Sequence, residues 1–443
     1  MLRNDCSIGR RPRKPSASLR ENDLGTTVHT DSSPAALKPD SLKGIRVIDF
    51  TIVMSGPLCT RTLADAGADV IKIEAPAGDV VRQRPPQRGG HSTYFSAMNC
   101  GKRSMVLDLQ TDAGKALARR LIAQADIVVE NFKPGVMKRL GLDHATLCRD
   151  NPRLIYCSIS GFGQTGPKAG TPAYAPVIHA ASGYEQAHMQ YQRGESRPAN
   201  NGIFLADVLG GLNAACAIQL ALYDRERTGL GQHIDVALMD SVLGMLIYEM
   251  QAAQFPPERP RQVYEPVRSN DGYVMVAAVT PKNLEVLFDV IGYPQGKTDP
   301  RFASVRSKEE NWTALLDIIE QWTSQRSGLE CETTLLAAGV PCSRYRSVAE
   351  AMADPQTVAR GTLARMGEGE DTFLVANPAY QMSRSRNVAR PMLATLGAHT
   401  EEVLREVLGC NADTLDGLRA AGVFGPAAKA GAPVHHGPEK THV

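Results

Sequence analysis

Short apolar stretches alternate with longer segments of helical period through the first 160 residues of the chain. The apolar stretches are expected to form strands within residues 42–51, 69–74, 104–109, 126–132 and 153–160. The periodic segments between them are expected to form helices within residues 55–67, 112–125 and 135–151. Alternation of strand and helix predicts an α/β fold, in which helices cover a parallel sheet.

The second half of the chain has a different pattern. Residues 204–226 and 235–254 have the period of two long apolar helices. The stretch "PPERPRQVYEP" is then typical of a linker, and a strand over 272–279 followed by shorter helices indicates a second, smaller domain. The predicted organisation is a disordered extension over 1–40, a large Rossmann-like domain over 42–235 completed by a C-terminal segment at about 360–425, a helix and linker over 236–262, a small α/β domain over 263–355, and a flexible tail over 426–443.

Composition narrows the classes of function. A net charge of +2 and an aromatic content of 5% argue against nucleic acid and against an anionic membrane surface as partners. No uninterrupted apolar run reaches the roughly 18 residues that span a bilayer. The nine cysteines are scattered without a Cys-x-x-Cys pair, so we expect no disulfide framework, no metal site and a cytoplasmic location. The basic N-terminus lacks an apolar core and is no secretory signal; a transit peptide, an extension and an over-long start remain open.

A glycine-rich stretch follows the strand expected over 153–160. In "ISGFGQTG" the glycines have the G-x-G-x-x-G spacing of a dinucleotide-binding loop. Such a site needs a helix that begins at the third glycine, and Pro167, Gly170 and Pro172 disfavour a helix there. We interpret the stretch as a glycine-rich loop rather than a nicotinamide or flavin site.

A single carboxylate stands out in "GIFLADVLGG", residues 202–211, where Asp207 lies among apolar residues and ahead of two glycines. A carboxylate that has lost its hydration is a stronger nucleophile, and glycines would let a bulky substrate approach closely. The competing interpretation is that Asp207 only caps the helix that follows it.

A series of longer motifs strengthens the first interpretation. They include "LADAGADVIKIEAPAGD", "NCGKRSMVLDL", "ENFKPGVMKRLGL", "NPRLIYCSISGFGQTGP", "ADVLGGLNAACAIQLALYDRERTGLGQHIDVALMDS", "AGVPCSRYRSVAEAMADPQ" and "LGAHTEEVLREVLG". Over about residues 42–410 the chain resembles the family III CoA-transferases, a group that includes formyl-CoA, carnitine and bile-acid-inducible CoA-transferases and also the α-methylacyl-CoA racemases.

The resemblance implies both a fold and a reaction. It implies a Rossmann-like large domain, a smaller α/β domain and a homodimer whose chains interlock. It further implies that CoA passes from an acyl-CoA to a small carboxylic acid through an aspartyl-CoA intermediate on Asp207, with oxyanions stabilised by N–H groups near the glycines. Coenzyme A is then needed only as part of the acyl-CoA substrate, and no metal or redox cofactor is expected.

The resemblance also assigns the CoA site residue by residue. The loop of Val53, Met54 and Ser55 matches the adenosine side, and the pair Asn131–Phe132 matches residues that face the nucleotide and pantetheine. The cations expected to meet phosphate are Lys102, Arg103 and Arg139. Lys133 stands where many members have arginine, which keeps the charge but not the bidentate fork.

The chain departs from the family pattern at two places. Ala175, after Tyr174, replaces an acid found in formyl-CoA transferases, and no glycine run is found near 255–270, where some transferases have a lid. The missing acid keeps open a non-catalytic subunit of a heteromeric transferase. It counts against the other alternative, an acyl-CoA racemase or epimerase, because that reaction needs two opposed acid/base groups. Residues that could recognise the acceptor acid lie between the two site segments, namely His179, Tyr184, His188, Arg193 and Arg197.

Overall fold

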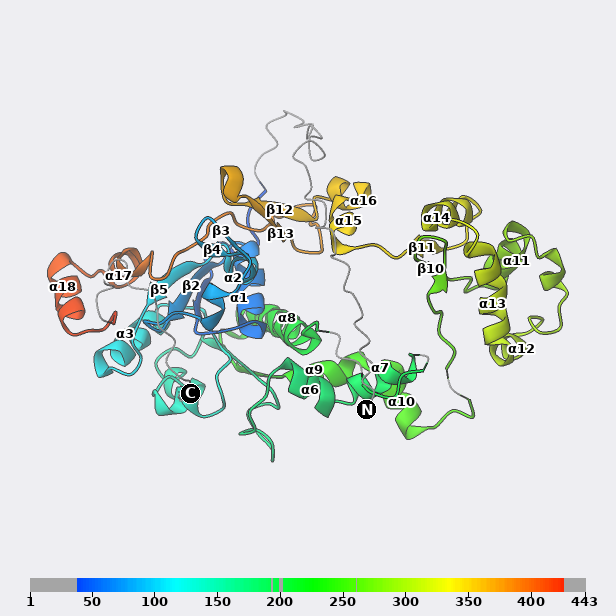
Figure 1. Ribbon diagram of the computed structural model, residues 1–443. Coiled ribbons are helices and arrows are strands. Elements are labelled where there is room, and N and C mark those ends of the chain that lie inside the picture. Colours follow the sequence, from blue (N-terminus) through cyan, green and yellow to red (C-terminus); the bar gives the residue numbers. More distant parts are fainter. Residues whose placement is uncertain (1–37, 193, 199–201, 260, 426–443) are drawn as a thin grey trace, which may run out of the picture. The chain divides into compact units, whose positions relative to one another are not determined.

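The computed structural model describes residues 38–192, 194–198, 202–259 and 261–425 (Figure 1). The predicted tail over 426–443, and all but the end of the predicted extension over 1–40, lie outside the described residues. At the centre is a six-stranded parallel sheet in the order β5-β2-β1-β6-β7-β8. Its strands are β1 (Arg46–Asp49), β2 (Asp69–Glu74), β5 (Arg103–Val106), β6 (Ile127–Glu130), β7 (Ile155–Ser160) and β8 (His233–Ala237). This is the Rossmann strand order, and it confirms the predicted α/β fold.

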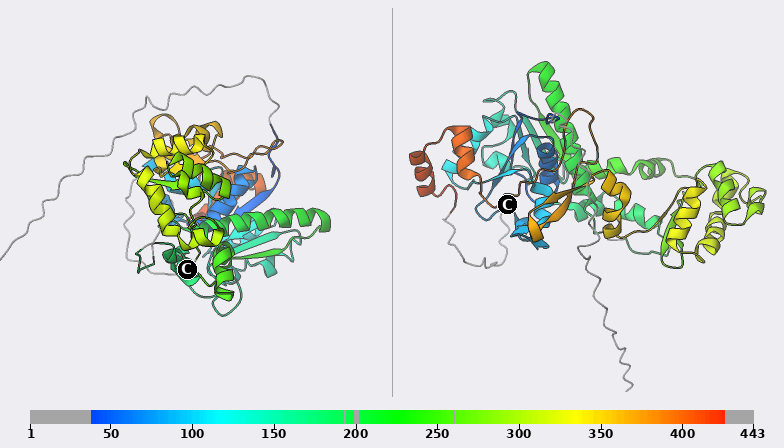
Figure 2. Two further views of the ribbon diagram at one scale, coloured as in Figure 1. Left: turned by 90° about the vertical axis from the view of Figure 1, so that its right-hand side faces the viewer. Right: turned by 90° about the horizontal axis from the view of Figure 1, so that it is seen from above.

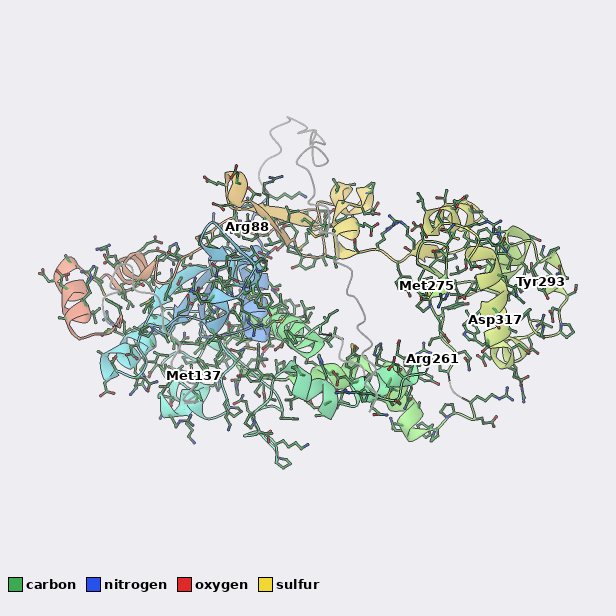
Figure 3. The ribbon with its side chains drawn as sticks, in the orientation of Figure 1. Arg88, Met137, Arg261, Met275, Tyr293 and Asp317 are labelled. Atoms are coloured by element: carbon green, nitrogen blue, oxygen red, sulfur yellow. The ribbon has the colours of Figure 1, made fainter. Side chains whose placement is uncertain are left out.

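Helices cover both faces of the sheet, because alternate side chains of each strand point to opposite faces. On β1, Val47 belongs to one apolar core and Ile48 to the other. Helices α1 (Ser55–Asp65) and α8 (Leu205–Thr228) pack in the first core, and α3 (Asp112–Ile122) and α17 (Thr400–Leu408) pack in the second. Met137, labelled in Figure 3, is also buried in the second core.

Helix α8 is the long green helix of Figure 2. Within the described part of the chain it alone is long and apolar enough to cross a membrane by length and composition. Its buried residues, among them Ala214 and Ile218, pack in the core with α1 and the sheet. The helix therefore serves as a core helix here.

Two predicted helices are corrected by the structure. Residues 135–151 form two single turns, α4 (Val136–Arg139) and α5 (His144–Leu147), because Gly141 adopts a φ of +68° and Asp143 caps a new start. Residues 235–254 begin as strand β8 and continue as α9 (Leu238–Met245) and α10 (Ile247–Gln254).

Two short helices between β7 and α8 were not predicted. They are α6 (Ala175–Ala181) and α7 (Tyr184–Gln190). The glycine-rich stretch after β7 forms no helix over residues 161–174, as expected.

A separate apolar core gathers residues between 264 and 342. It surrounds an antiparallel sheet of order β11-β10-β9, to which Met275 of Figure 3 belongs. Its elements are β9 (Val267–Arg268), β10 (Tyr273–Val276), α11 (Pro281–Val290), α12 (Val305–Glu310), α13 (Trp312–Thr323), α14 (Gly328–Ala337) and β11 (Cys342–Arg344). The proposed domain bounds remain a prediction.

The C-terminal segment packs against the first sheet. The His399 N–H donates to the Ser104 carbonyl at 2.9 Å, and the Asp108 N–H donates to the Val423 carbonyl at 2.8 Å. Helix α17 thereby lies beside the edge strand β5. The remaining elements are η2 (Val80–Gln83), β3 (Gln87–Arg88), β4 (His91–Ser92), α2 (Thr93–Asn99), η3 (Pro294–Lys297), α15 (Val348–Ala353), α16 (Pro355–Ala359), β12 (Leu363–Met366), η4 (Gly369–Asp371), β13 (Phe373–Ala376) and α18 (Ala412–Ala420).

Candidate active site

A pocket of about 410 Å³ opens at the carboxyl ends of the central strands. The loops after β1, β6 and β7 line it, together with Asp207 of α8 and Leu238 at the start of α9. The strand order reverses between β1 and β6, and such switch points are where open α/β sheets bind ligands. The predicted residues that line the pocket are Val53, Met54, Ser55, Asn131, Phe132, Lys133 and Asp207.

Asp207 occupies the third position of α8. The N-cap is Phe204, and no side-chain cap hydrogen bond is formed from it, so Asp207 is not the N-cap residue. Burial raises the pKa of the Asp207 carboxyl to about 6, and a hydrogen bond with the Ser55 side chain opposes that rise. The site therefore holds a partly desolvated carboxylate that is still mostly ionised near pH 7.

The two glycines after Asp207 have a different role from the predicted one. A Cβ on Gly210 would lie 2.3 Å from Leu238 Cδ2, and a Cβ on Gly211 would lie 2.6 Å from the Ser55 carbonyl oxygen. These glycines let α8 pack tightly against α9 and the start of α1, rather than opening a path for substrate. Their N–H groups lie in the second turn, where helical hydrogen bonds already use them, and so they are not oxyanion donors.

Asn131 joins two loops of the pocket. Its amide accepts a hydrogen bond from the Ile52 N–H at 2.8 Å and donates to the Ile52 carbonyl at 2.9 Å. The same amide nitrogen lies 3.4 Å from Ser55 Oγ. This pairing fixes the loop that carries Met54 and Ser55 beside the loop that carries Phe132.

Buried carboxylates, which the sequence did not single out, hold the same loops from beneath. Val53 adopts a φ of +66°, which is costly for a β-branched residue, and its N–H donates to Asp79 Oδ2 at 3.2 Å. The Phe132 N–H donates to Glu130 Oε2 at 2.9 Å, and burial raises the pKa of Glu130 to about 7. Both positions could have been noticed in the sequence, since Asp79 lies in the loop that follows strand β2 and Glu130 is the last residue of β6, just ahead of the pocket loop.

The prediction that Lys102 meets phosphate does not fit its surroundings. Its side chain is 1% exposed, and its ammonium contacts the Asp49 carboxylate at 3.0 Å. It also lies 2.7 Å from Thr60 Oγ1, 2.8 Å from Asn99 Oδ1 and 2.9 Å from the Pro57 carbonyl. Lys102 is thus a buried structural cation beneath α1.

Arg103 is also engaged away from the pocket. Its guanidinium donates to Asp69 at 2.6 and 2.9 Å and pairs with Glu402 and Glu406 of α17. These contacts join β5 to the C-terminal segment, and they do not fit the predicted phosphate role. Arg139 is exposed on α4, which follows the pocket loop of residues 131–134, and its phosphate role remains a prediction.

The segment ahead of Asp207 contributes some residues to the pocket wall and others to the core. Tyr174 lines the pocket and is 71% exposed, whereas Ala175 is buried at the start of α6. His179 is buried and faces α8 rather than the pocket. Of the other proposed acceptor-binding residues, Tyr184 and His188 lie on α7, Arg197 is exposed, and Arg193 lies outside the described residues.

Pocket-lining residues missed by the sequence come mostly from the end of β7 and the segment that follows it, over residues 159–174. Gly161, the first glycine of the G-x-G-x-x-G spacing, lies in the wall of the same pocket as Asp207. The other members are Ile52, Pro134, Ile159, Ser160, Thr171, Pro172, Ala173, Tyr174 and Leu238. Most of them lie at the carboxyl end of a parallel strand or in the segment that follows it, and such segments meet at one edge of the sheet.

Comparison with known proteins gives the class of this molecule. The family model described as CoA-transferase family III matches residues 42–400. Acetyl-CoA:oxalate CoA-transferase of Acetobacter aceti is 38% identical over 348 residues, covering 76% of this chain and 89% of that protein. Succinate–glutarate CoA-transferase of Agrobacterium fabrum is 35% identical over 389 residues, covering 83% of this chain and 95% of that protein.

A solved structure agrees. A CAIB/BAIF family protein from Brucella suis matches with a TM-score of 0.74 and 34% sequence identity, covering 84% of this chain and 100% of that one. The fold and these relatives define an enzyme of the CoA-transferase class. The chain belongs to CoA-transferase family III.

Proposed function

We propose that this enzyme moves CoA from an acyl-CoA donor to a small carboxylic acid through a covalent aspartyl-CoA intermediate on Asp207. The observation that carries the proposal is a partly buried carboxylate, with a pKa raised to about 6, in the wall of a pocket at the switch point of the sheet. Relatives named for oxalate, and for succinate and glutarate, support small carboxylic acids as the acceptor class.

The chemistry needs only the carboxylate and the two substrates. An Asp207 oxygen attacks the thioester carbonyl, the carbon–sulfur bond breaks, and a mixed anhydride and CoA thiolate result. The thiolate attacks the aspartyl carbonyl, which releases the donor acid and leaves aspartyl-CoA. The acceptor carboxylate then attacks this thioester, and the returning thiolate forms the new acyl-CoA and restores Asp207. No proton, metal or electron is consumed.

The pocket walls support this order of events. Apolar residues such as Met54 and Phe132 exclude water that would hydrolyse the anhydride or the thioester. The Ser55 hydroxyl contacts Asp207 and can donate to the oxyanion that forms on either carbonyl. Lys133 supplies positive charge at the pocket for the phosphates of CoA.

The same pocket bears on the racemase alternative. Racemisation needs two acid/base groups on opposite sides of the α-carbon. Asp207 is the only carboxylate among the described lining residues, and none of those residues is a histidine. This arrangement favours transfer over racemisation.

We further propose that the enzyme acts as a homodimer in the cytoplasm. The support is the family resemblance for the dimer, and the scattered cysteines for the compartment. A non-catalytic subunit is disfavoured because Asp207 is retained in the pocket.

The test is to trap the intermediate. The purified enzyme is mixed with a panel of acyl-CoAs and then with hydroxylamine, which converts an activated aspartyl group to a hydroxamate. Peptide mass spectrometry should find the hydroxamate on Asp207, dependent on the acyl-CoA, and Asp207→Asn should abolish it. The matched control is Asp240→Asn, an exposed acid on α9. Transfer of CoA without any Asp207 adduct would refute the covalent route.

A further inference from the structure

His179 is a buried histidine whose ring contacts the turn that carries Asp207. The side chain belongs to α6 and is 3% exposed. Its Nε2 lies 3.1 Å from the main-chain nitrogen of Ala206, the residue just ahead of Asp207. A main-chain N–H can only donate, so Nε2 must be the unprotonated ring nitrogen. The proton of the neutral ring therefore lies on Nδ1, which is 3.9 Å from Glu185 Oε1.

The first turn of α8 needs such an acceptor. The first N–H groups of any helix lack partners within the helix, and an N-cap side chain usually satisfies one of them. In α8 the N-cap is Phe204, which offers no acceptor, and Asp207 is the only acid of the first turn. Without His179, Asp207 is the side chain of the first turn that could accept hydrogen bonds from the free amides of that turn.

We propose that His179 is a positioning residue that caps α8 from α6 and so leaves the Asp207 carboxylate directed to the pocket. The inference rests on the proposed function of Asp207. It assigns to His179 a task that does not involve touching either substrate. The Ser55 hydroxyl then remains the side-chain partner of the carboxylate, as observed.

The surroundings of His179 suit a fixed, neutral ring. Burial lowers the pKa of His179, and Glu185 of α7 opposes this effect. The Tyr184 ring meets the imidazole edge to face, with centroids 5.5 Å apart. Helix α6 also connects His179 to the pocket, because Tyr174, the N-cap residue of α6, lines the pocket.

The proposal is tested with two substitutions at the same position. In His179→Gln the amide oxygen can stand where Nε2 stands and accept from Ala206, whereas His179→Ala removes the acceptor. We expect His179→Ala to lower kcat by about a hundredfold, since small displacements of a reacting group have effects of this size. The KM for acyl-CoA should stay within about threefold of the wild-type value, because the pocket loops remain in place. His179→Gln should recover most of kcat, and His91→Ala, at a half-buried histidine on β4, is the control.

Two outcomes overturn the proposal. One is a His179→Ala enzyme that folds, as judged by its thermal midpoint, and keeps full kcat. The other is a His179→Gln enzyme as slow as His179→Ala. The tautomer of the His179 ring can be measured without following the reaction. Long-range nitrogen spectra of histidine-labelled protein should show an unprotonated Nε2 at His179, and a protonated Nε2 would refute the cap.

The two proposals fail in different ways. If the wild-type enzyme transfers CoA with no trapped Asp207 while the tautomer is as expected, the covalent route is wrong and the cap stands as a structural feature only. If Asp207 is trapped equally in the wild type and in His179→Ala, the positioning role is wrong and the covalent route stands.

Discussion

The main-chain N–H of Val53 donates to the carboxylate of Asp79, which in turn lies 3.4 Å from the buried ammonium of Lys72. The same ammonium donates to the Thr51 carbonyl at 2.6 Å. A buried ion pair thus holds the pocket loop from beneath and keeps Val53 at its positive φ. The charge that fixes this loop lies in the core and not at the pocket.

The first prediction concerns this ion pair. Asp79→Asn should lower the free energy of unfolding by about 3–5 kcal/mol, because it removes the carboxylate that is paired with the buried Lys72 ammonium. Urea unfolding followed by circular dichroism measures the change. Asp112→Asn is the control, since the Asp112 side chain is fully exposed in its pair with Lys115, and such pairs contribute about 0–1 kcal/mol. Equal effects of the two substitutions would show that the buried pair does not stabilise the loop.

The second prediction is the pH dependence of the first chemical step. Only the ionised Asp207 carboxylate attacks the thioester, and burial raises its pKa to about 6. The rate at which the donor acid is released on mixing enzyme with acyl-CoA should therefore rise with pH and level off above about pH 7. A rapid-quench, single-turnover assay of the free donor acid measures this rate. A rate that is constant down to about pH 5 would mean that Asp207 keeps the ordinary pKa of an aspartate.

The third prediction is the stability of Asp207→Asn. The folded-state pKa of Asp207 lies above its unfolded value, so the folded protein binds the proton more tightly. Ionisation above pH 6 therefore costs stability, whereas below the unfolded pKa of 3.8 the cost is absent. Asp207→Asn should raise the free energy of unfolding near pH 8 by on the order of 2 kcal/mol. Asp240→Asn should leave it unchanged, and a less stable Asp207→Asn protein would contradict the prediction.

The fourth prediction tests the close packing of α8. Gly211→Ala would place its Cβ 2.6 Å from the Ser55 carbonyl oxygen, so α1 and α8 must separate. We expect a loss of about 1–3 kcal/mol in stability, and a fall in kcat because Ser55 moves away from Asp207. Gly244→Ala in α9 is the matched control, since its Cβ would meet nothing within 4 Å and alanine favours a helix. Equal thermal midpoints for the two variants would show that a Cβ at position 211 does not force α1 and α8 apart.

The fifth prediction separates the cations that were assigned to phosphate. Lys133→Gln should raise the KM for acyl-CoA several-fold, because Lys133 lines the pocket. Arg103→Gln should leave this KM unchanged, because Arg103 is paired with Asp69 and with acids of α17. Steady-state kinetics at low and high salt measure both, and only the Lys133 effect should shrink with salt. The opposite ranking would restore Arg103 to the CoA site.

Much of the sheet could be predicted because parallel strands buried on both faces leave continuous apolar runs. The run "DVIKIE" coincides with β2 over Asp69–Glu74. Strand β8 was missed because "HIDVA" is half exposed and continues without a break into the apolar α9. Helix α6 was missed because it is a short segment just after a loop rich in glycine and proline.

The candidate site was predicted in part from the sequence. The loop residues Met54 and Phe132 line the pocket with Asp207, because motif positions at strand ends converge at one edge of the sheet. Nothing in the local sequence around "GKRS" indicates that Lys102 is buried. Its partner Asp49 is 53 positions away in the sequence, and local patterns carry no information on such a pairing.

The contacts between the C-terminal segment and the first sheet set the order in which this protein can fold. Leu404 and Val423 belong to the same apolar core as Ile48. Pairing over such separations is slow, because a long loop must close before any contact repays its entropy. During synthesis the strands made first therefore wait, with one apolar face covered only in part by α3, until residues 403–423 have left the ribosome. A chain interrupted before residue 400 should depend on chaperones or aggregate, even though every residue lining the pocket has already been made.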